Sequence, residues 1–123
     1  MVKDSFTEIE KVVTNYFYGL FYGDVKKLNA CFHKNLYVYG DIEGTSYLKR
    51  RDEFLEEIQI RKSPNELGEP FGMEIIGIDL WDKIAVVKTH ILMFEYNFYD
   101  FLSLNQINGE WMIVCKMMKA IGH

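Results

Sequence analysis

The sequence predicts an α+β fold in which three N-terminal helices pack on a curved antiparallel sheet. Through much of the first half, apolar residues recur at helical spacing, whereas the residues after the prolines alternate as they do in strands. Both prolines lie between these two parts, within residues 61–70, which favours one long loop there. An order of helices followed by a meander of strands is typical of α+β domains rather than of alternating α/β folds.

The first two predicted helices form a hairpin. Ser5 and Glu8 have the spacing of a capping box, and Gly23 supplies a stop for the first helix. Asp24 can cap a second, short helix that ends near residues 33–35. The apolar positions are Ile9, Val12, Val13, Tyr16, Phe17 and Leu20 in the first helix, and Val25, Leu28, Cys31 and Phe32 in the second.

A strand is predicted over residues 36–42, in which Leu36, Val38, Gly40 and Ile42 alternate with Tyr37, Tyr39 and Asp41. Residues 43–45 turn the chain, and a third helix with Phe54, Leu55 and Ile58 on its apolar side is expected over residues 49–61. The remaining predicted strands cover residues 71–80, 84–96, 98–107 and 110–120.

The strongest local signal is Asn108-Gly109, because a two-residue type I′ hairpin turn needs positive φ at both positions. This turn sets the register of the strands on either side of it. One face then pairs Gln106 with Trp111, Leu104 with Ile113, Leu102 with Cys115 and Asp100 with Met117, and the other carries Phe101, Ser103, Val114, Lys116 and Met118. The first face is expected to look toward the helices, with Asp100 among its apolar side chains.

An inward carboxylate needs a reason, because burying an unpaired charge costs several kcal/mol in effect. Asp100 either reaches water near the strand end and caps a neighbouring backbone group, or it serves a ligand site. Ionisable groups with shifted pKa values collect at sites and also occur in structural networks, so both interpretations stay open.

Composition indicates one domain with a single core, which we place at residues 1–121 of the 123. Gly122-His123 resembles a tag remnant, so His123 is set aside. Aromatic residues make up 15% of the chain, which predicts an interior that is filled or lined by large flat side chains. We expect that interior to be an aromatic-lined cavity.

Several classes of protein and site are disfavoured. The net charge of -4 and the short, acid-diluted basic clusters argue against nucleic-acid binding. The chain shows neither an apolar run of signal-peptide length nor a membrane span, so the expected location is the cytoplasm. Cys31 and Cys115 lack CxxC spacing, and no His/Asp/Glu spacing supports a metal site. No cofactor motif is present, so neither metal nor cofactor is expected.

The order of helix hairpin, strand, helix and meander resembles the nuclear transport factor 2-like (SnoaL-like) superfamily, whose cystatin-like cone encloses a pocket. The segment from Asp100 to Lys116, DFLSLNQINGEWMIVCK, looks like the Asp-aromatic-Leu…Gly-x-Trp-x-Ile-x-x-Lys ending of the branch labelled putative lumazine-binding proteins. Gln106 stands where that branch often has Lys. The resemblance covers nearly the whole chain and implies a small-molecule binding protein. Members of the superfamily commonly dimerise through the outer sheet face, so the resemblance also implies a homodimer.

A second resemblance lies near the N-terminus, where residues 15–24, NYFYGLFYGD, and 30–32, ACF, are similar to the first helices of ketosteroid isomerases. In that family a helical Tyr and a strand Asp form an oxyanion hole, and a separate Asp is the general base. The resemblance assigns Tyr16 and Asp100 to the oxyanion hole. It implies an isomerase, dehydratase or cyclase that acts next to a carbonyl.

The general base of that family has no direct counterpart. The matching strand position is Gly40, and Asp41 is displaced by one residue and therefore points to the opposite face. His90 depends on the turn near residues 96–98, and we favour an even-numbered loop that places it outside. His33 follows the second helix and is a further candidate base.

The first functional hypothesis is a binding protein for a small hydrophobic or aromatic molecule, and the second is the carbonyl-directed enzyme with an unproven base. A third is an interaction module in which the cavity is merely structural and the sheet face is the working surface. The predicted ligand-binding residues are Tyr16, Phe17, Leu20, Phe32, Tyr37 or Tyr39, Phe54, Ile58, Met93, Asp100 and Trp111, with Tyr16 and Asp100 as the hypothetical catalytic pair.

Overall fold

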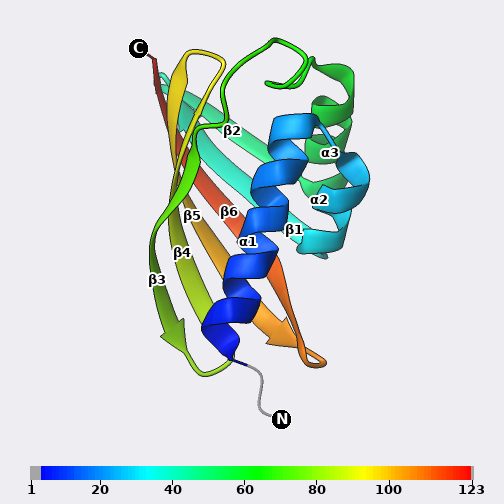
Figure 1. The fold of residues 1–123 in the computed structure, drawn as a ribbon, viewed down its shortest axis with the longest axis vertical. Coiled ribbons are helices and arrows are strands. Elements are labelled where there is room, and N and C mark those ends of the chain that lie inside the picture. Colours follow the sequence, from blue (N-terminus) through cyan, green and yellow to red (C-terminus); the bar gives the residue numbers. More distant parts are fainter. Residues whose placement is uncertain (1–3, 123) are drawn as a thin grey trace.

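The computed structural model describes residues 4–122, and residues 1–3 and His123 lie outside this range. Within it, three helices lie against one face of a six-stranded sheet (Figure 1). The helices are α1 (Ser5–Tyr22), α2 (Val25–Cys31) and α3 (Arg51–Ile60). The strands are β1 (Phe32–Ile42), β2 (Thr45–Arg50), β3 (Met73–Trp81), β4 (Ile84–Met93), β5 (Tyr96–Ile107) and β6 (Glu110–Gly122).

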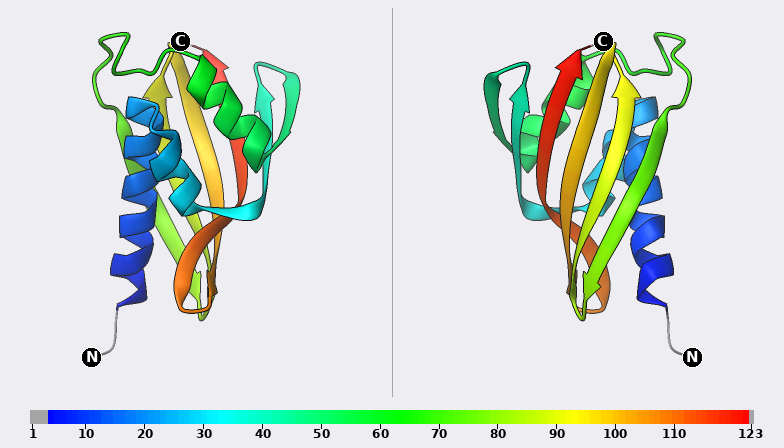
Figure 2. Two further views of the ribbon diagram at one scale, coloured as in Figure 1. Left: turned by 90° about the vertical axis from the view of Figure 1, so that its right-hand side faces the viewer. Right: turned by 90° about the vertical axis from the view of Figure 1, so that its left-hand side faces the viewer.

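The strand order across the sheet is β2-β1-β6-β5-β4-β3. Each neighbouring pair is antiparallel except β1 and β6, which run parallel. The expectation of a wholly antiparallel sheet is therefore corrected at this one junction, where a long stretch of chain separates the two strands and no tight turn dictates their direction. The sheet is strongly curved, and α1 and α3 lie along its concave side (Figure 2).

Two-residue turns join the antiparallel hairpins. The predicted Asn108-Gly109 turn is confirmed, with φ of 51° and 82°. The turn between β4 and β5 lies at Phe94 and Glu95, with φ of 56° and 64°, and not near residues 96–98 as predicted, but it is even-numbered as expected. Such turns match the right-handed twist of the strands that they connect, which explains why non-glycine residues are held in the left-handed region here.

Helix capping is close to the prediction. The N-cap of α1 is Asp4 rather than Ser5, and its side chain accepts a hydrogen bond from the Phe6 amide at 3.1 Å. Gly23 ends α1 in the left-handed conformation, and Asp24 caps α2 through the Lys27 amide at 3.1 Å, both as predicted. The hairpin of α1 and α2 is thereby fixed by local chemistry that the sequence displays.

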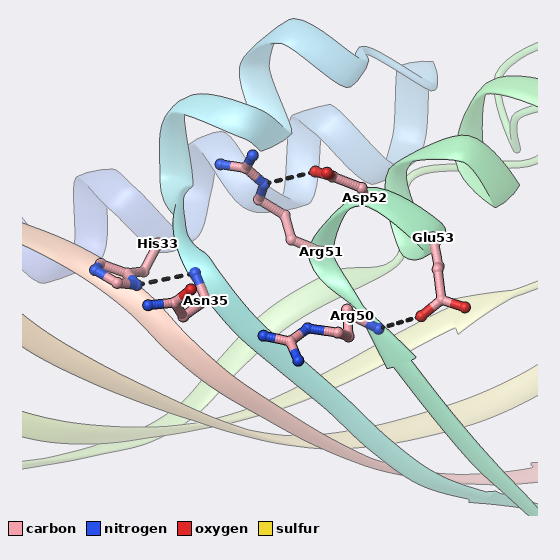
Figure 3. Close-up of polar contacts among 6 residues, drawn as sticks. All are labelled: His33, Asn35, Arg50, Arg51, Asp52 and Glu53. Atoms are coloured by element: carbon pink, nitrogen blue, oxygen red, sulfur yellow. Dashed lines mark hydrogen bonds and ion pairs between the residues drawn. The ribbon is translucent and has the colours of Figure 1, made fainter.

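Two predictions before the long loop are wrong. The second helix ends at Cys31 and not near residues 33–35, because Phe32 is extended and already buried as the first residue of β1. Residues 45–50 form β2 and not the approach to a helix, and α3 begins at Arg51. Figure 3 shows this start, where the Arg50 amide donates to Glu53 Oε1 at 3.0 Å.

The strand pair β5–β6 contains a bulge that reverses part of the predicted facing. Gln106 pairs with Trp111 and Leu104 with Ile113 as expected, but the register shifts between Ser103 and Leu104. Val114 is the extra residue on β6, because Ser103 pairs with Cys115 and Leu104 with Ile113. Beyond it, Lys116 and Met118 are buried on the inner face, with 2% and 8% exposure, and Met117 is exposed on the outer face.

The core lies between the inner face of the sheet and the buried stripe of α1. Gly19 allows α2 to approach α1 closely, because a Cβ there would lie 2.6 Å from the Leu28 side chain. The Met118 side chain occupies the space over Gly40 on the neighbouring strand. Among the described residues, no helix combines the length and the apolar character that a membrane crossing requires.

Gly40→Ala tests how tightly this inner face is packed. The new Cβ would lie 2.8 Å from Met118 Cγ and 3.1 Å from the Met118 carbonyl oxygen, so we expect a loss of about 1–3 kcal/mol of unfolding free energy. Gly77→Ala is the matched control, because no atom lies within 4 Å of its added Cβ. Urea denaturation should show the loss for Gly40→Ala alone, and equal midpoints for the two variants would contradict it.

Candidate functional site

A polar cluster of Tyr16, Asp100 and Lys116 lies in the core. The Tyr16 hydroxyl donates a hydrogen bond to Asp100 Oδ2 at 2.7 Å. Lys116 Nζ donates to the Tyr16 hydroxyl oxygen at 2.5 Å and lies 3.5 Å from the same carboxylate oxygen. The side chains of Lys116 and Asp100 are 3% and 0% exposed, so the cluster is an enclosed ion pair bridged by a phenol.

Three elements deliver these side chains to one point. Tyr16 projects from the buried stripe of α1, whereas Asp100 stands on β5 and Lys116 on β6. The Val114 bulge is what turns Lys116 inward, because an unbroken register would point it to the outer face. The predicted convergence of Tyr16 and Asp100 is present, whereas the contribution of Lys116 was missed.

Burial shapes the protonation of the cluster. Removal from water lowers the pKa of Lys116, and the neighbouring Asp100 carboxylate opposes this by raising it. Burial, followed by the charge and hydrogen bond of Asp100, holds the pKa of Tyr16 well above 10.0, so Tyr16 stays a hydroxyl donor near neutral pH. The Lys116 ammonium also lies over the rings of Tyr16 and Phe54, 5.0 Å and 4.9 Å from their centroids, where the ring faces attract a cation.

Two buried oxygen atoms beside the cluster have no hydrogen-bond partner among the described residues. They are Asp100 Oδ1 and Thr89 Oγ1. Thr89 on β4 is the direct cross-strand partner of Asp100 on β5, and both residues are buried on the inner face. Unsatisfied buried polar atoms are rare in folded proteins, and leaving one unpaired costs about 1–3 kcal/mol.

Three of the predicted lining residues, Phe17, Phe32 and Phe54, pack around the cluster. The ring centroids of Tyr16 lie 5.9 Å from Phe17 and 6.0 Å from Phe32, and Phe32 packs against Phe54 at 6.0 Å. Leu20 and Ile58 belong to the same buried core. The side chains buried here are those of Phe17, Leu20, Phe32, Phe54 and Ile58.

Met93 and Trp111 are buried on the inner face but belong to other parts of it. Trp111 pairs with Gln106, six residues along β5 from Asp100, which corresponds to about 20 Å of strand. Met93 pairs with Tyr96 beside the β4–β5 turn. Met93 and Trp111 therefore lie toward the ends of the inner face, away from the polar cluster.

Tyr37 and Tyr39 do not face the cluster, and their assignment to its lining is wrong. Leu36 and Val38 take the inner positions on β1, so the alternating tyrosines point outward. The Tyr37 hydroxyl accepts a hydrogen bond from Arg50 Nη1 at 2.8 Å, and Tyr39 is 45% exposed.

None of the three candidate bases lies at the cluster. His90 lies outside as predicted, where Nε2 contacts Asn97 Oδ1 at 2.8 Å and the ring stacks on Tyr99. Asp41 pairs at the surface with Lys119 at 2.6 Å. The Asn35 amide donates to His33 Nδ1 at 3.0 Å in an exposed stretch of β1 (Figure 3).

The described residues contain no cluster of His, Cys, Asp and Glu that would hold a metal ion. Cys31 and Cys115 are both free thiols. Burial raises the pKa of the Cys31 thiol to about 11, and its Sγ donates to the Lys27 carbonyl at 3.3 Å. Neither cysteine is activated as a nucleophile.

The cluster is covered by side chains. Five hollows in the described part of the chain are lined by other residues, including one of about 410 Å³ on the outer face near Trp81 and Val86. On the inner face, Met118 fills the space beside Asp100, its cross-strand partner. The aromatic rings next to the cluster are packed against one another. The expected aromatic-lined cavity is not among these hollows, because none of them lies at the cluster.

Comparison with known proteins identifies the family and the fold of this chain. A family model described as "Putative lumazine-binding" matches residues 4–119. The fold is that of NTF2-like proteins. One of unknown function from Methylobacillus flagellatus is 18% identical, with a TM-score of 0.87 over 99% of this chain and 96% of that one. Another from Silicibacter pomeroyi is 20% identical, with a TM-score of 0.81 over 94% and 95% of the two chains.

A ketosteroid isomerase-like protein from Erwinia carotovora atroseptica shares the fold at 13% identity. Its TM-score is 0.73 over 99% of this chain and 100% of that one. The search of the curated proteins found no match. At these identities the solved structures establish the fold alone.

Breaking the buried ion pair should destabilise the protein strongly. Lys116→Met leaves the Asp100 carboxylate uncompensated in the core, so we expect a loss of about 3–5 kcal/mol of unfolding free energy. The double variant Asp100→Asn/Lys116→Met should lose less than the sum of the single losses, because each single change leaves a charge unpaired.

Urea denaturation of the single and double variants measures this coupling. The control is Lys119→Met, which breaks the exposed pair with Asp41 on the outer face and should shift the midpoint far less. Strictly additive losses at Asp100 and Lys116 would show that the two charges do not stabilise each other.

Proposed function

This chain belongs to the putative lumazine-binding family, and from that premise we propose that it binds a small, flat, largely apolar molecule on the inner face of the sheet. The observation that carries the proposal is the enclosed cluster of Tyr16, Asp100 and Lys116 with an unpartnered carboxylate oxygen. Aromatic side chains around it offer the stacking surfaces that planar molecules prefer.

The energetic cost of the cluster supports a role beyond folding. Taking two charges out of water costs several kcal/mol for each ion, and replacing a buried ion pair with well-packed apolar residues is often neutral or stabilising. The Tyr16 hydrogen bond and the ion pair use Asp100 Oδ2, so Oδ1 keeps its full capacity to accept. A ligand that donates to Oδ1 would recover part of this cost.

Space for such a ligand would come from flexible side chains. Met118 lies beside Asp100 and fills the position over Gly40. Methionine side chains have three rotatable bonds and repack with little cost, so Met118 is the residue that we expect a ligand to displace. Met73 and Met93 are buried on the same inner face and add to its adaptability.

Lumazine, the compound in the family description, is the first probe to test. We expect it to raise the midpoint of thermal unfolding of the wild-type protein, because a ligand that binds only the folded state stabilises it. Isothermal titration calorimetry would give the dissociation constant, and Tyr16→Phe and Asp100→Asn should weaken binding about tenfold or more. Tyr18→Phe, an exposed tyrosine on the same helix, is the matched control.

The affinities of these variants show whether lumazine binds at the buried cluster or elsewhere on the protein. Equal affinities of wild type, Tyr16→Phe and Asp100→Asn would remove the cluster from the binding site. A loss of affinity in Tyr18→Phe of the same size would indicate that the effect is not specific to the interior.

A second candidate is an enzyme of the ketosteroid isomerase type that moves a proton next to a carbonyl. The contact that favours it is the buried 2.7 Å hydrogen bond between Tyr16 and Asp100. This role requires the Lys116 proton to pass to Asp100. The Tyr16 hydroxyl and the protonated Asp100 would then donate to the enolate oxygen, and the neutral Lys116 amine, whose pKa burial lowers, would be the nearest group to act as base.

Exchange of the α-protons of small ketones for deuterium tests this candidate. Proton NMR in heavy water should show faster exchange with the wild-type protein than with Lys116→Met, and Lys119→Met should match the wild type. Exchange at the buffer rate with the wild-type protein would leave binding as the better assignment.

The outer sheet face favours assembly with a second copy of the chain. Tyr99, Phe101 and Met117 are between 45% and 53% exposed there, and Trp81 is 79% exposed. These residues lie on β3, β5 and β6, opposite the helices (Figure 2). An apolar patch spread over neighbouring strands is typical of an interface, and a twofold axis lets one patch cover another.

Phe101→Glu should therefore dissociate a wild-type homodimer into monomers, because it places a charge in the apolar interface. Analytical ultracentrifugation over a range of concentrations measures the change. Ile60→Glu, on α3 and 77% exposed, is the control and should leave the dimer intact. A wild-type protein that sediments as a monomer throughout would overturn the dimer.

A further inference from the structure

The polar cluster lies nearer to one end of the sheet than to the other. Along β5, Asp100 is about 13 Å from Tyr96, where the strand begins, and about 23 Å from Ile107, where it ends. The nearer end carries the β4–β5 turn, and the C-terminal end of α3 and the loop of residues 61–72 lie at the same end of the molecule (Figure 1). The shortest route from solvent along the inner face to the cluster therefore starts there.

Arg61, the C-cap residue of α3, links this helix to the β4–β5 turn. Its guanidinium group lies over the ring of Phe94, 4.8 Å from the centroid. The Phe94 backbone is held in place, because its amide donates to Glu69 Oε1 at 3.0 Å. The charge of Arg61 also reaches the cluster, since burial lowers the pKa of Lys116 and the positive charge of Arg61 lowers it further.

The position over Phe94 leaves the guanidinium group of Arg61 incompletely satisfied. Its Nη2 atom is buried and has no hydrogen-bond partner among residues 4–122, and none of the ion pairs in this range includes Arg61. The contact with the Phe94 ring offsets only part of the cost of an unpaired buried donor, and the Lys116 ammonium repels the guanidinium group.

A second position for the same group is available beside Glu57. A hollow of about 460 Å³ is lined by Arg61 together with Lys49, Glu53, Glu56, Glu57 and Ile60. The Arg61 amide donates to the Glu57 carbonyl at 3.1 Å, so the two residues keep the helical spacing at which a glutamate and a basic residue pair. The Tyr47 hydroxyl donates to Glu57 Oε2, which leaves Oε1 to accept from Arg61. Exposed pairs of this kind stabilise only weakly, so the two positions differ little in free energy.

We propose that Arg61 is a latch with two positions, over the Phe94 ring and beside Glu57, and that a small molecule reaches the inner face of the sheet when Arg61 leaves Phe94. In the closed position the guanidinium group holds α3 against the β4–β5 turn. In the open position it pairs with Glu57 and frees the Phe94 ring. The inference rests on the proposed binding function, because it describes the route to that site.

Alkylation of a thiol on the inner face measures entry without any ligand. Met118→Cys places a thiol beside Asp100, and mass spectrometry gives its rate of reaction with iodoacetamide. Adding Arg61→Ala should raise this rate about tenfold or more, because an open state that is about 10% populated or less becomes the main state. Adding Glu57→Gln should lower the rate about twofold, because the open position loses its ion pair.

Two controls separate a latch from a general loosening of the fold. The native Cys31 thiol, buried in α2, is alkylated in the same molecules and should react at the same rate in every variant. Arg50→Ala removes a guanidinium group that lies 4.6 Å from the centroid of the Tyr37 ring, which is the same kind of contact away from the β4–β5 turn. It should leave the alkylation rate of the introduced thiol unchanged.

The inference is overturned if Arg61→Ala leaves that rate unchanged, or if it speeds the reaction of both thiols equally. An unchanged rate in Glu57→Gln would show that Arg61 has no second position beside Glu57, and would overturn the latch as well.

Lumazine connects the latch to the binding function. In stopped-flow mixing, Arg61→Ala should speed both association and dissociation of lumazine, and unaltered rates would overturn the proposed route. Failure of lumazine to bind the wild-type protein would instead reject the binding function, whereas the alkylation rates would still decide the latch.

Discussion

The ion pair between Asp100 and Lys116 inside the core is the constraint on which the rest of the arrangement depends. Neither charge is tolerable there alone, so the sheet must present both to the same point. The Val114 bulge achieves this by turning Lys116 inward, and α1 must then pass at the height where Tyr16 bridges the two. The packed rings around the cluster keep water away, which strengthens each of these contacts and also shifts the pKa values of Tyr16 and Lys116 in opposite directions.

The sequence predicted the features that rest on local chemistry. The Asn108-Gly109 turn, Gly23 and Asp24 each have a strong conformational preference, and an inward Asp100 near Tyr16 followed from the hairpin register together with the family resemblance. A bulge leaves almost no trace in composition, so the inward direction of Lys116 was not foreseen. The edge strand β2 was missed because it is short and its two apolar residues, Tyr47 and Leu48, are adjacent and so do not alternate along the sequence. The tyrosines of β1 were misplaced because an aromatic residue in a strand suits either face.

Binding and catalysis make different demands on the same cluster. An oxyanion hole needs two donors aimed at one point, whereas Tyr16 donates to Asp100 and accepts from Lys116. What remains free beside the cluster is an acceptor on Asp100 and a hydroxyl on Thr89. Asp100 Oδ1 can accept a hydrogen bond from a ligand as the cluster stands, whereas enolate stabilisation requires the hydrogen bonds of Tyr16 and Asp100 to be rearranged first.

The parallel pairing of β1 with β6 has a consequence for how the chain acquires its structure. The strand that lies between β1 and β5 in the sheet is the one that is synthesised last among the described residues. Until residues 110–122 emerge from the ribosome, no strand joins the hairpin β1–β2 to the meander β3–β5. Asp100 also lacks its ion-pair partner Lys116 until then. Folding therefore has to await contacts between distant parts of the chain, which slows it, and the exposed edges of β1 and β5 in the nascent chain are the places where misassociation would begin.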